Sequence, residues 1–100
     1  MAIVNVTEKE FDATIASGTV VVDFGATWCG PCQMQAKLLD AKFAPAHPDV
    51  TIAKVDIDQN MALAAKFGIQ SIPALRVFKD GHLVASFDGL TKPDELATVL

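Results

Sequence analysis

Apolar and polar residues follow one another along this chain in blocks that predict strands and helices in alternation. Short blocks rich in valine, isoleucine and phenylalanine predict strands. The block at 20–24 is apolar except at one position, which is typical of a strand covered on both faces. The predicted strands span residues 3–6, 20–24, 51–57, 74–78 and 83–87. The segments between them place apolar residues three to five positions apart, which predicts amphipathic helices.

Capping residues place the ends of three of these helices. Thr7 and Glu10 have the spacing of a capping box, so the first helix begins after Thr7, and Gly18 closes it. Asn60 is expected to cap a short helix that runs through Phe67. The last helix opens at residues 91–94 and runs towards the end of the chain.

The longest predicted helix covers residues 30–44, and Pro45 is expected to end it. Its apolar residues recur at helical spacing and predict a stripe that packs against the core. The expected stripe consists of Met34, Leu38, Leu39 and Phe43. Later in the chain, Asp80 and Gly81 are a strong signal for a hairpin turn between the last two strands.

The predicted order of elements is that of an α/β protein. Strands that alternate with helices imply a largely parallel central sheet with helices on both faces, and the closing hairpin adds antiparallel pairing. At 100 residues the chain is expected to form one domain, residues 1–100, with its own hydrophobic core.

Composition and charge narrow the class of function. Hydrophobic residues make up 51% and charged residues 20%, which fits a compact globule. The net charge is −4 and the basic residues are scattered, so we expect no nucleic-acid partner. No apolar run is long enough to span a bilayer, and residues 1–6 lack the pattern of an export signal, so we expect a cytoplasmic protein without a membrane partner.

The chain has two cysteines, and both lie where the predicted strand 20–24 passes into the long helix. Cys29 and Cys32 are three residues apart, so on a helix they face the same side and can approach disulfide distance. Reactive groups in such sheets gather beyond the carboxyl ends of the strands. This pair is therefore the candidate reactive site.

Three readings of the cysteine pair compete. A zinc site needs about four ligands, and only His47 and His82 could add nitrogens, in poor motif context. A structural disulfide across so short a loop would constrain the unfolded chain little. The third reading is a catalytic dithiol. The start of a helix stabilises a thiolate at Cys29, the nucleophile, while Cys32, one turn deeper, is expected to be more shielded and to resolve the mixed disulfide.

At these residues the chain resembles the thioredoxin family, and the resemblance covers essentially its whole length. The matching segments are 21–24, the Trp-Cys-Gly-Pro-Cys sequence at 28–32, 54–56, 71–73, 78–81 and Gly89. The resemblance implies a thioredoxin fold with a mixed sheet of four to five strands, and a protein-disulfide reductase without bound cofactor or metal. It also implies electrons from thioredoxin reductase, disulfide-containing client proteins as substrates, and a monomer.

The resemblance also implies roles for residues around the cysteines. Asp23 would be buried, with a raised pKa, and would exchange a proton with Cys32, and Lys54 would lie near Asp23. A surface-facing Asp23 and an ordinary solvent-reaching Lys54 are the alternatives. The resemblance also implies that the bond between Ile72 and Pro73 is cis, as it is before the family's proline. The residues expected to form an uncharged docking surface for clients are Trp28, Gly30, Pro31, Ile72, Pro73, Gly89 and Leu90.

Several positions depart from the family pattern. Gly25 stands where a tryptophan or another larger residue is common, so we expect a looser and more solvent-open loop. Lys37 stands in place of a kinking proline, which predicts a straighter helix. Gln33 replaces a basic residue and Ala74 a threonine, which leaves redox potential and partner choice open. An oxidase or isomerase on the same fold, or a binding module with incidental thiols, are the alternative functions.

Overall fold

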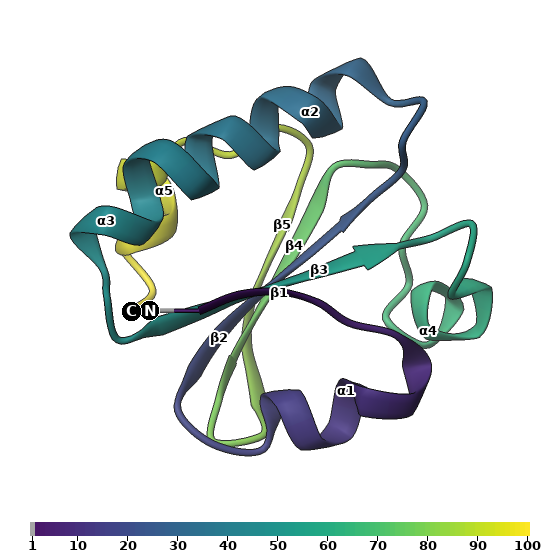
Figure 1. Cartoon of the computed structure of the whole chain (residues 1–100), viewed down its shortest axis with the longest axis horizontal. Helices are drawn as coiled ribbons and strands as arrows, with labels where there is room; N and C mark the ends of the chain where they lie inside the picture. The colour runs from purple at the N-terminus through teal and green to yellow at the C-terminus, as the bar shows by residue number, and fades with distance from the viewer. Residues whose placement is uncertain (1) are drawn as a thin grey trace.

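The computed structural model describes residues 2–100, so Met1, the first residue of the stretch read for an export signal, lies outside the described residues. The described chain forms a five-stranded sheet with helices on both faces (Figure 1). The strands are β1 (Ala2–Asn5), β2 (Thr19–Gly25), β3 (Val50–Asp56), β4 (Ala74–Lys79) and β5 (His82–Asp88). Each starts and ends within two residues of its predicted position.

The strand order is β1-β3-β2-β4-β5, which makes the sheet mixed, as expected. Strand β3 runs parallel to both β1 and β2, whereas β4 runs antiparallel to β2 and to β5. The central strand β2 is therefore hydrogen-bonded to β3 on one side and to β4 on the other. Asp80 and Gly81 join β4 to β5 with φ angles of 49° and 86°, a two-residue hairpin turn of the kind that the sequence predicts.

Helices cover the two faces of the sheet unequally (Figure 1). One face carries α1 (Glu8–Ile15) and α4 (Met61–Lys66). The other carries α2 (Gly30–Lys37), its π-helical continuation η1 (Leu38–Phe43), α3 (Ala44–Ala46) and α5 (Pro93–Ala97). None of the helices within residues 2–100 has the length and apolarity needed to cross a membrane.

Side chains of β2 enter two separate cores because successive residues of a strand point to opposite faces. Val20, Val22 and Phe24 belong to the cluster that includes Phe11 of α1. Val21 belongs to the other cluster, which is formed with residues of η1 and α5. This two-sided burial explains the nearly unbroken apolar run at 20–24.

The capping box of α1 is present, since the Thr7 backbone N–H and hydroxyl both contact the Glu10 carboxylate. The expected cap of α4 is not formed, although Asn60 occupies the N-cap position. Its side-chain oxygen accepts a hydrogen bond of 3.0 Å from the Glu8 N–H, and its amide nitrogen donates to the Asp56 carbonyl at 2.9 Å. Asn60 thus ties the start of α1 to the end of β3 instead of capping its own helix.

The long helix differs from its prediction in three ways. Its backbone changes from α to π geometry at Leu38, and it continues through Pro45 to Ala46. Met34 does not belong to the buried stripe, because half of its surface is exposed. The buried positions of α2 are Cys32 and Gln35, followed by Leu39 and Phe43 in η1. A buried glutamine in the stripe explains why apolar spacing alone misplaced this face.

Candidate active site

Three loops meet at one end of the sheet. Phe24 near the end of β2 pairs with Ala74 at the start of β4, and Ala74 also pairs with Asp88 at the end of β5. The loop that leads to Cys29, the loop that contains Ile72 and Pro73, and the turn at Gly89 therefore leave the sheet side by side. This is the carboxyl end of β2, where the sequence places the reactive site.

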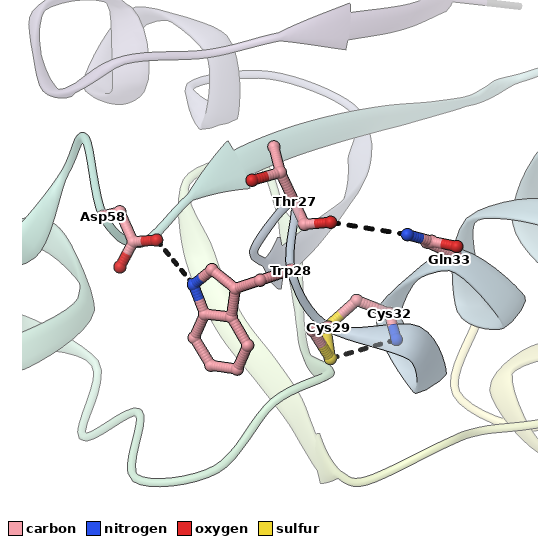
Figure 2. Close-up of a disulfide and its surroundings, with 6 residues drawn as sticks. All are labelled: Thr27, Trp28, Cys29, Cys32, Gln33 and Asp58. Atoms are coloured by element: carbon pink, nitrogen blue, oxygen red, sulfur yellow. Dashed lines mark hydrogen bonds between the residues drawn. A yellow bond between two sulfur atoms is a disulfide. The ribbon is translucent and has the colours of Figure 1, made fainter.

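The two cysteines form a disulfide at the start of α2 (Figure 2). Their Cα atoms are 5.2 Å apart, within the usual range for a disulfide. Cys29 is the N-cap residue, and its sulfur accepts a hydrogen bond of 3.2 Å from the Cys32 N–H. Gly30 and Pro31 form the exposed first turn, where a proline costs no intrahelical hydrogen bond. The helix start thus directs an N–H group at the Cys29 sulfur.

The two cysteines are equally buried, contrary to the expectation that Cys32 is the more shielded. Cys29 is 6% exposed and Cys32 is 7% exposed. A cavity of about 470 Å³ lies against Cys32, and its wall includes Gly25 but not Cys29. A Cβ atom at Gly25 would lie 3.3 Å from Cys32 Cβ and 3.4 Å from its sulfur. The missing side chain at Gly25 therefore leaves Cys32 uncovered on this side.

Trp28 lies on the surface beside the disulfide (Figure 2). Its side chain is 68% exposed, and its indole N–H donates a hydrogen bond of 2.8 Å to Asp58. The backbone carbonyl of Thr27 accepts a longer bond of 3.4 Å from the Gln33 side chain. Asp58 was not a candidate in the sequence, because only the fold brings the loop after β3 to the indole ring.

The peptide bond between Ile72 and Pro73 is cis. The Gly89 N–H donates a hydrogen bond of 2.8 Å to the Pro73 carbonyl, which joins the loop before β4 to the turn after β5. Gly89 has a φ of 88°, a left-handed conformation that favours glycine. Pro73 is buried, Ile72 is half-buried, and Leu90 is 50% exposed.

Gln35 connects this loop pair to α2, and it was not a candidate in the sequence. Its side chain is fully buried and bonds Thr91 in both directions. The Gln35 amide donates to the Thr91 carbonyl at 3.0 Å, and the Thr91 N–H donates to the Gln35 oxygen at 2.8 Å. The signal in the sequence was its spacing, since Gln35 is one helical turn from Cys32 and from Leu39.

We expect Gln35→Met to lower the free energy of unfolding by about 2 kcal/mol, because it leaves two buried backbone groups of Thr91 without partners. Methionine keeps the approximate volume, so packing changes little. The measurement is urea unfolding at pH 7, with Gln33→Met as the matched control on the exposed side of α2. Equal unfolding free energies for the two variants would contradict this role.

Asp23 is buried in the middle of the sheet. Its side chain is 6% exposed, and its Oδ1 atom has no hydrogen-bond partner among the described residues. Burial raises the pKa of Asp23 to about 6; the positive charge of Lys54 opposes this effect, and the negative charge of Asp40 adds to it. Asp23 and Cys32 line the same cavity.

Lys54 lies beside Asp23 in the parallel register of β2 and β3, but its ammonium group bonds a different carboxylate. Its Nζ atom is 2.6 Å from Asp40 Oδ2, in a partly buried ion pair. Asp40, in η1, was not a candidate in the sequence. Because Asp40 holds the Lys54 ammonium, the Asp23 carboxyl has no direct ion-pair partner within residues 2–100.

The arrangement is suited to the exchange of electrons between thiols and disulfides. Two sulfurs at bonding distance can alternate between disulfide and dithiol, and the start of a helix stabilises the thiolate form. Residues 2–100 hold no group of three or more histidine, cysteine or acidic side chains placed to bind a metal ion.

Comparison with known proteins gives consistent matches. The family model described as Thioredoxin matches residues 2–100. A thioredoxin from Staphylococcus aureus is 47% identical over 100 residues, which are all of this chain and 96% of that protein.

Solved structures agree in fold. A mutant thioredoxin from Halobacterium salinarum NRC-1 superposes with a TM-score of 0.86 at 35% identity, covering 98% of this chain and 88% of that one. A chain from a study of thiol resolution in a yeast mitochondrial 1-Cys peroxiredoxin by glutathione and thioredoxin systems also has a TM-score of 0.86. It is 34% identical and covers 96% of this chain and 91% of that one.

Proposed function

Since this chain belongs to the thioredoxin family and is a thiol-disulfide oxidoreductase, we propose that it reduces client proteins with electrons from thioredoxin reductase. The observation that carries the proposal is the position of Cys29 at the N-cap of α2, with its sulfur facing the Cys32 N–H. An anion at that point is stabilised by the helix dipole and by the N–H group.

The reaction proceeds in two exchange steps. The Cys29 thiolate attacks one sulfur of the client disulfide, which forms a mixed disulfide and releases the other client sulfur as a thiolate that takes up a proton. The Cys32 thiolate then attacks the Cys29 sulfur, which closes the Cys29–Cys32 disulfide and releases the second client thiol. The client gains two electrons and two protons, and the reductase returns two electrons to the chain.

Asp23 serves the second step in this proposal. Cys32 must lose its proton before it can attack, and a carboxylate whose pKa is about 6 is a base suited to neutral pH. Both groups line one cavity, which supports a proton exchange between them. Lys54 acts on Asp23 through its charge, since its ammonium group is bound to Asp40.

Clients dock on the surface around Cys29 in this proposal. Trp28 and Leu90 expose large apolar areas, and Gly30 and Pro31 add an exposed turn without charge. An extended client segment can pair with the backbone at Ile72, beside Pro73 and Gly89. The proposed working form is a monomer in the cytoplasm, where a dithiol is kept reduced.

Turnover of insulin disulfides with NADPH and thioredoxin reductase tests this function. We expect steady NADPH oxidation that depends on this chain and on insulin together, because each exchange returns the Cys29–Cys32 disulfide to the reductase. Net oxidation of reduced insulin by the disulfide form, without turnover of NADPH, would favour an oxidase instead. No exchange in either direction would favour a binding module.

A further inference from the structure

The cavity against Cys32 has the dimensions of a ligand site. Its volume of about 470 Å³ falls within the range of small-molecule pockets, roughly 300–1,000 Å³. Its walls come from the end of β2, from β3, from α2 and from the segment that joins β1 to α1. Gly25 and Ala36 supply almost no side-chain volume, so the space between these elements stays open.

This cavity is separate from the surface proposed for clients. Cys32 belongs to its wall, whereas Trp28, Cys29, Pro73 and Gly89 do not. A molecule in the cavity would therefore contact Cys32 and leave uncovered the surface around Cys29 that is proposed to bind clients.

The charges of the cavity favour a cation. Asp23 and Asp56 both belong to its wall, and the one basic side chain there, Lys54, is bound to Asp40 at 2.6 Å. Only 6% of the surface of Asp23 is exposed, and its Oδ1 atom lacks a hydrogen-bond donor among the described residues. A buried carboxylate without donors is stabilised by any hydrogen-bond donor or positive charge brought to it. The remaining wall is largely formed by carbon atoms, which suits an apolar body.

We propose that the cavity between β2, β3 and α2 binds a small free organic cation with an apolar body, such as an arylamidine, against Asp23 and Cys32. The cationic head is directed at the Asp23 carboxylate, and the apolar body lies along Gly25 and Ala36. The site exists in the disulfide form, so binding does not depend on redox turnover. In the reduced form the bound molecule covers the Cys32 thiol and leaves Cys29 free to react.

A series of three ring compounds of nearly equal shape tests the charge preference. Benzamidine is cationic, benzamide is a neutral donor, and benzoate is anionic. We expect benzamidine to shift the backbone amide resonances of Gly25 and Ala36 in the oxidised full chain, with a dissociation constant about tenfold or more below that of benzoate. Benzamide should lie between the two. Equal binding of all three, binding of none, or shifts centred on Trp28 would overturn the proposal.

Two variants locate the site and a third identifies the carboxylate. Ala36→Leu should abolish the benzamidine shifts by filling the cavity, whereas Ala97→Leu, at a similarly half-buried helical alanine on α5, should leave them unchanged. Asp23→Asn should remove the preference for benzamidine over benzoate. The preference surviving in Asp23→Asn, or the shifts surviving in Ala36→Leu, would overturn the proposal. These binding measurements use no reductase, so loss of insulin turnover alone would count against the proposed function and not against this site.

In the reduced protein, benzamidine should also slow the alkylation of Cys32 by iodoacetamide and leave that of Cys29 unchanged. The two modified cysteines are distinguished by peptide mass spectrometry after partial reaction. Protection of Cys29 alone would place the ligand on the client side of the disulfide and overturn the proposal.

Discussion

Cys29→Ser is expected to lower the catalysed rate of insulin reduction by on the order of 1,000-fold or more, so that only the rate of the chemical reductant alone remains. A serine hydroxyl at the N-cap still accepts the hydrogen bond from the Cys32 N–H, so the helix start is preserved. The hydroxyl cannot attack a disulfide at neutral pH, because only a thiolate is a competent nucleophile in this exchange. The assay is insulin turbidity with dithiothreitol, with the fold of the variant checked by urea unfolding.

Cys32→Ser is the matched control for this result. It retains the first nucleophile and lacks the second, so it should accumulate a mixed disulfide between Cys29 and the client that persists until a reductant is added. A Cys29→Ser variant that reduces insulin at more than a tenth of the wild-type rate would contradict the assignment of the two sulfurs. A mixed disulfide that forms through Cys32 instead of Cys29 in the wild-type protein would also contradict this assignment.

Asp23→Asn is expected to raise the free energy of unfolding by up to about 3 kcal/mol at pH 7. The folded pKa of Asp23 is about 6, against an ordinary value of 3.8, and each pKa unit corresponds to about 1.4 kcal/mol. Burial disfavours the charged form, so the ionised carboxylate weakens the folded state. An amide of the same shape removes the charge. The same variant should slow the second exchange step if Asp23 is the base for Cys32, as proposed above.

The gain from Asp23→Asn depends on pH in a defined direction. Because the folded pKa is raised, the folded state binds the proton more tightly, and wild-type stability falls as pH rises from about 4 to about 6. Well below pH 3.8 both states are protonated at Asp23, so the variant should have almost no advantage there, and at pH 4 only a small one. Above pH 6 the advantage should stay constant. Asp58→Asn is the control, since Asp58 is exposed.

The measurement is urea unfolding of wild type, Asp23→Asn and Asp58→Asn at pH 4, 5, 6 and 7. An advantage of Asp23→Asn that is equal at pH 4 and pH 7 would show that packing, and not charge, is responsible. A loss of stability at pH 7 would contradict the effect of burial on Asp23.

Features set by neighbours in the sequence could be predicted. The hairpin at Asp80 and Gly81 forms because both residues adopt positive φ, which short polar and glycine residues tolerate. The strand at 20–24 was found because β2 is buried on both faces and so needs no polar alternation. The position of the disulfide could also be predicted, because Cys29 and Cys32 lie one helical turn apart and such residues face the same side of a helix.

Features that depend on distant partners were missed. Gln35 is buried because Thr91, far along the chain, satisfies its amide, and nothing in the helical pattern reveals that partner. Lys54 bonds Asp40 because η1 packs in the same core cluster as β3, which a strand prediction does not show. The equal burial of Cys29 and Cys32 depends on the cavity beside Gly25, whose walls come from segments that are far apart in the sequence.

The alkylation rate of Cys29 as a function of pH tests most directly whether this residue is a thiolate at the start of α2. The reduced protein is treated with iodoacetamide between pH 5 and pH 10, and the two cysteines are followed separately by peptide mass spectrometry. We expect the Cys29 rate to reach half its maximum well below the value of about 8.5 for a free cysteine, and the Cys32 rate to rise only at higher pH. If both thiols react only above about pH 8.5, the helix start does not stabilise a thiolate, and Cys29 is not the activated nucleophile.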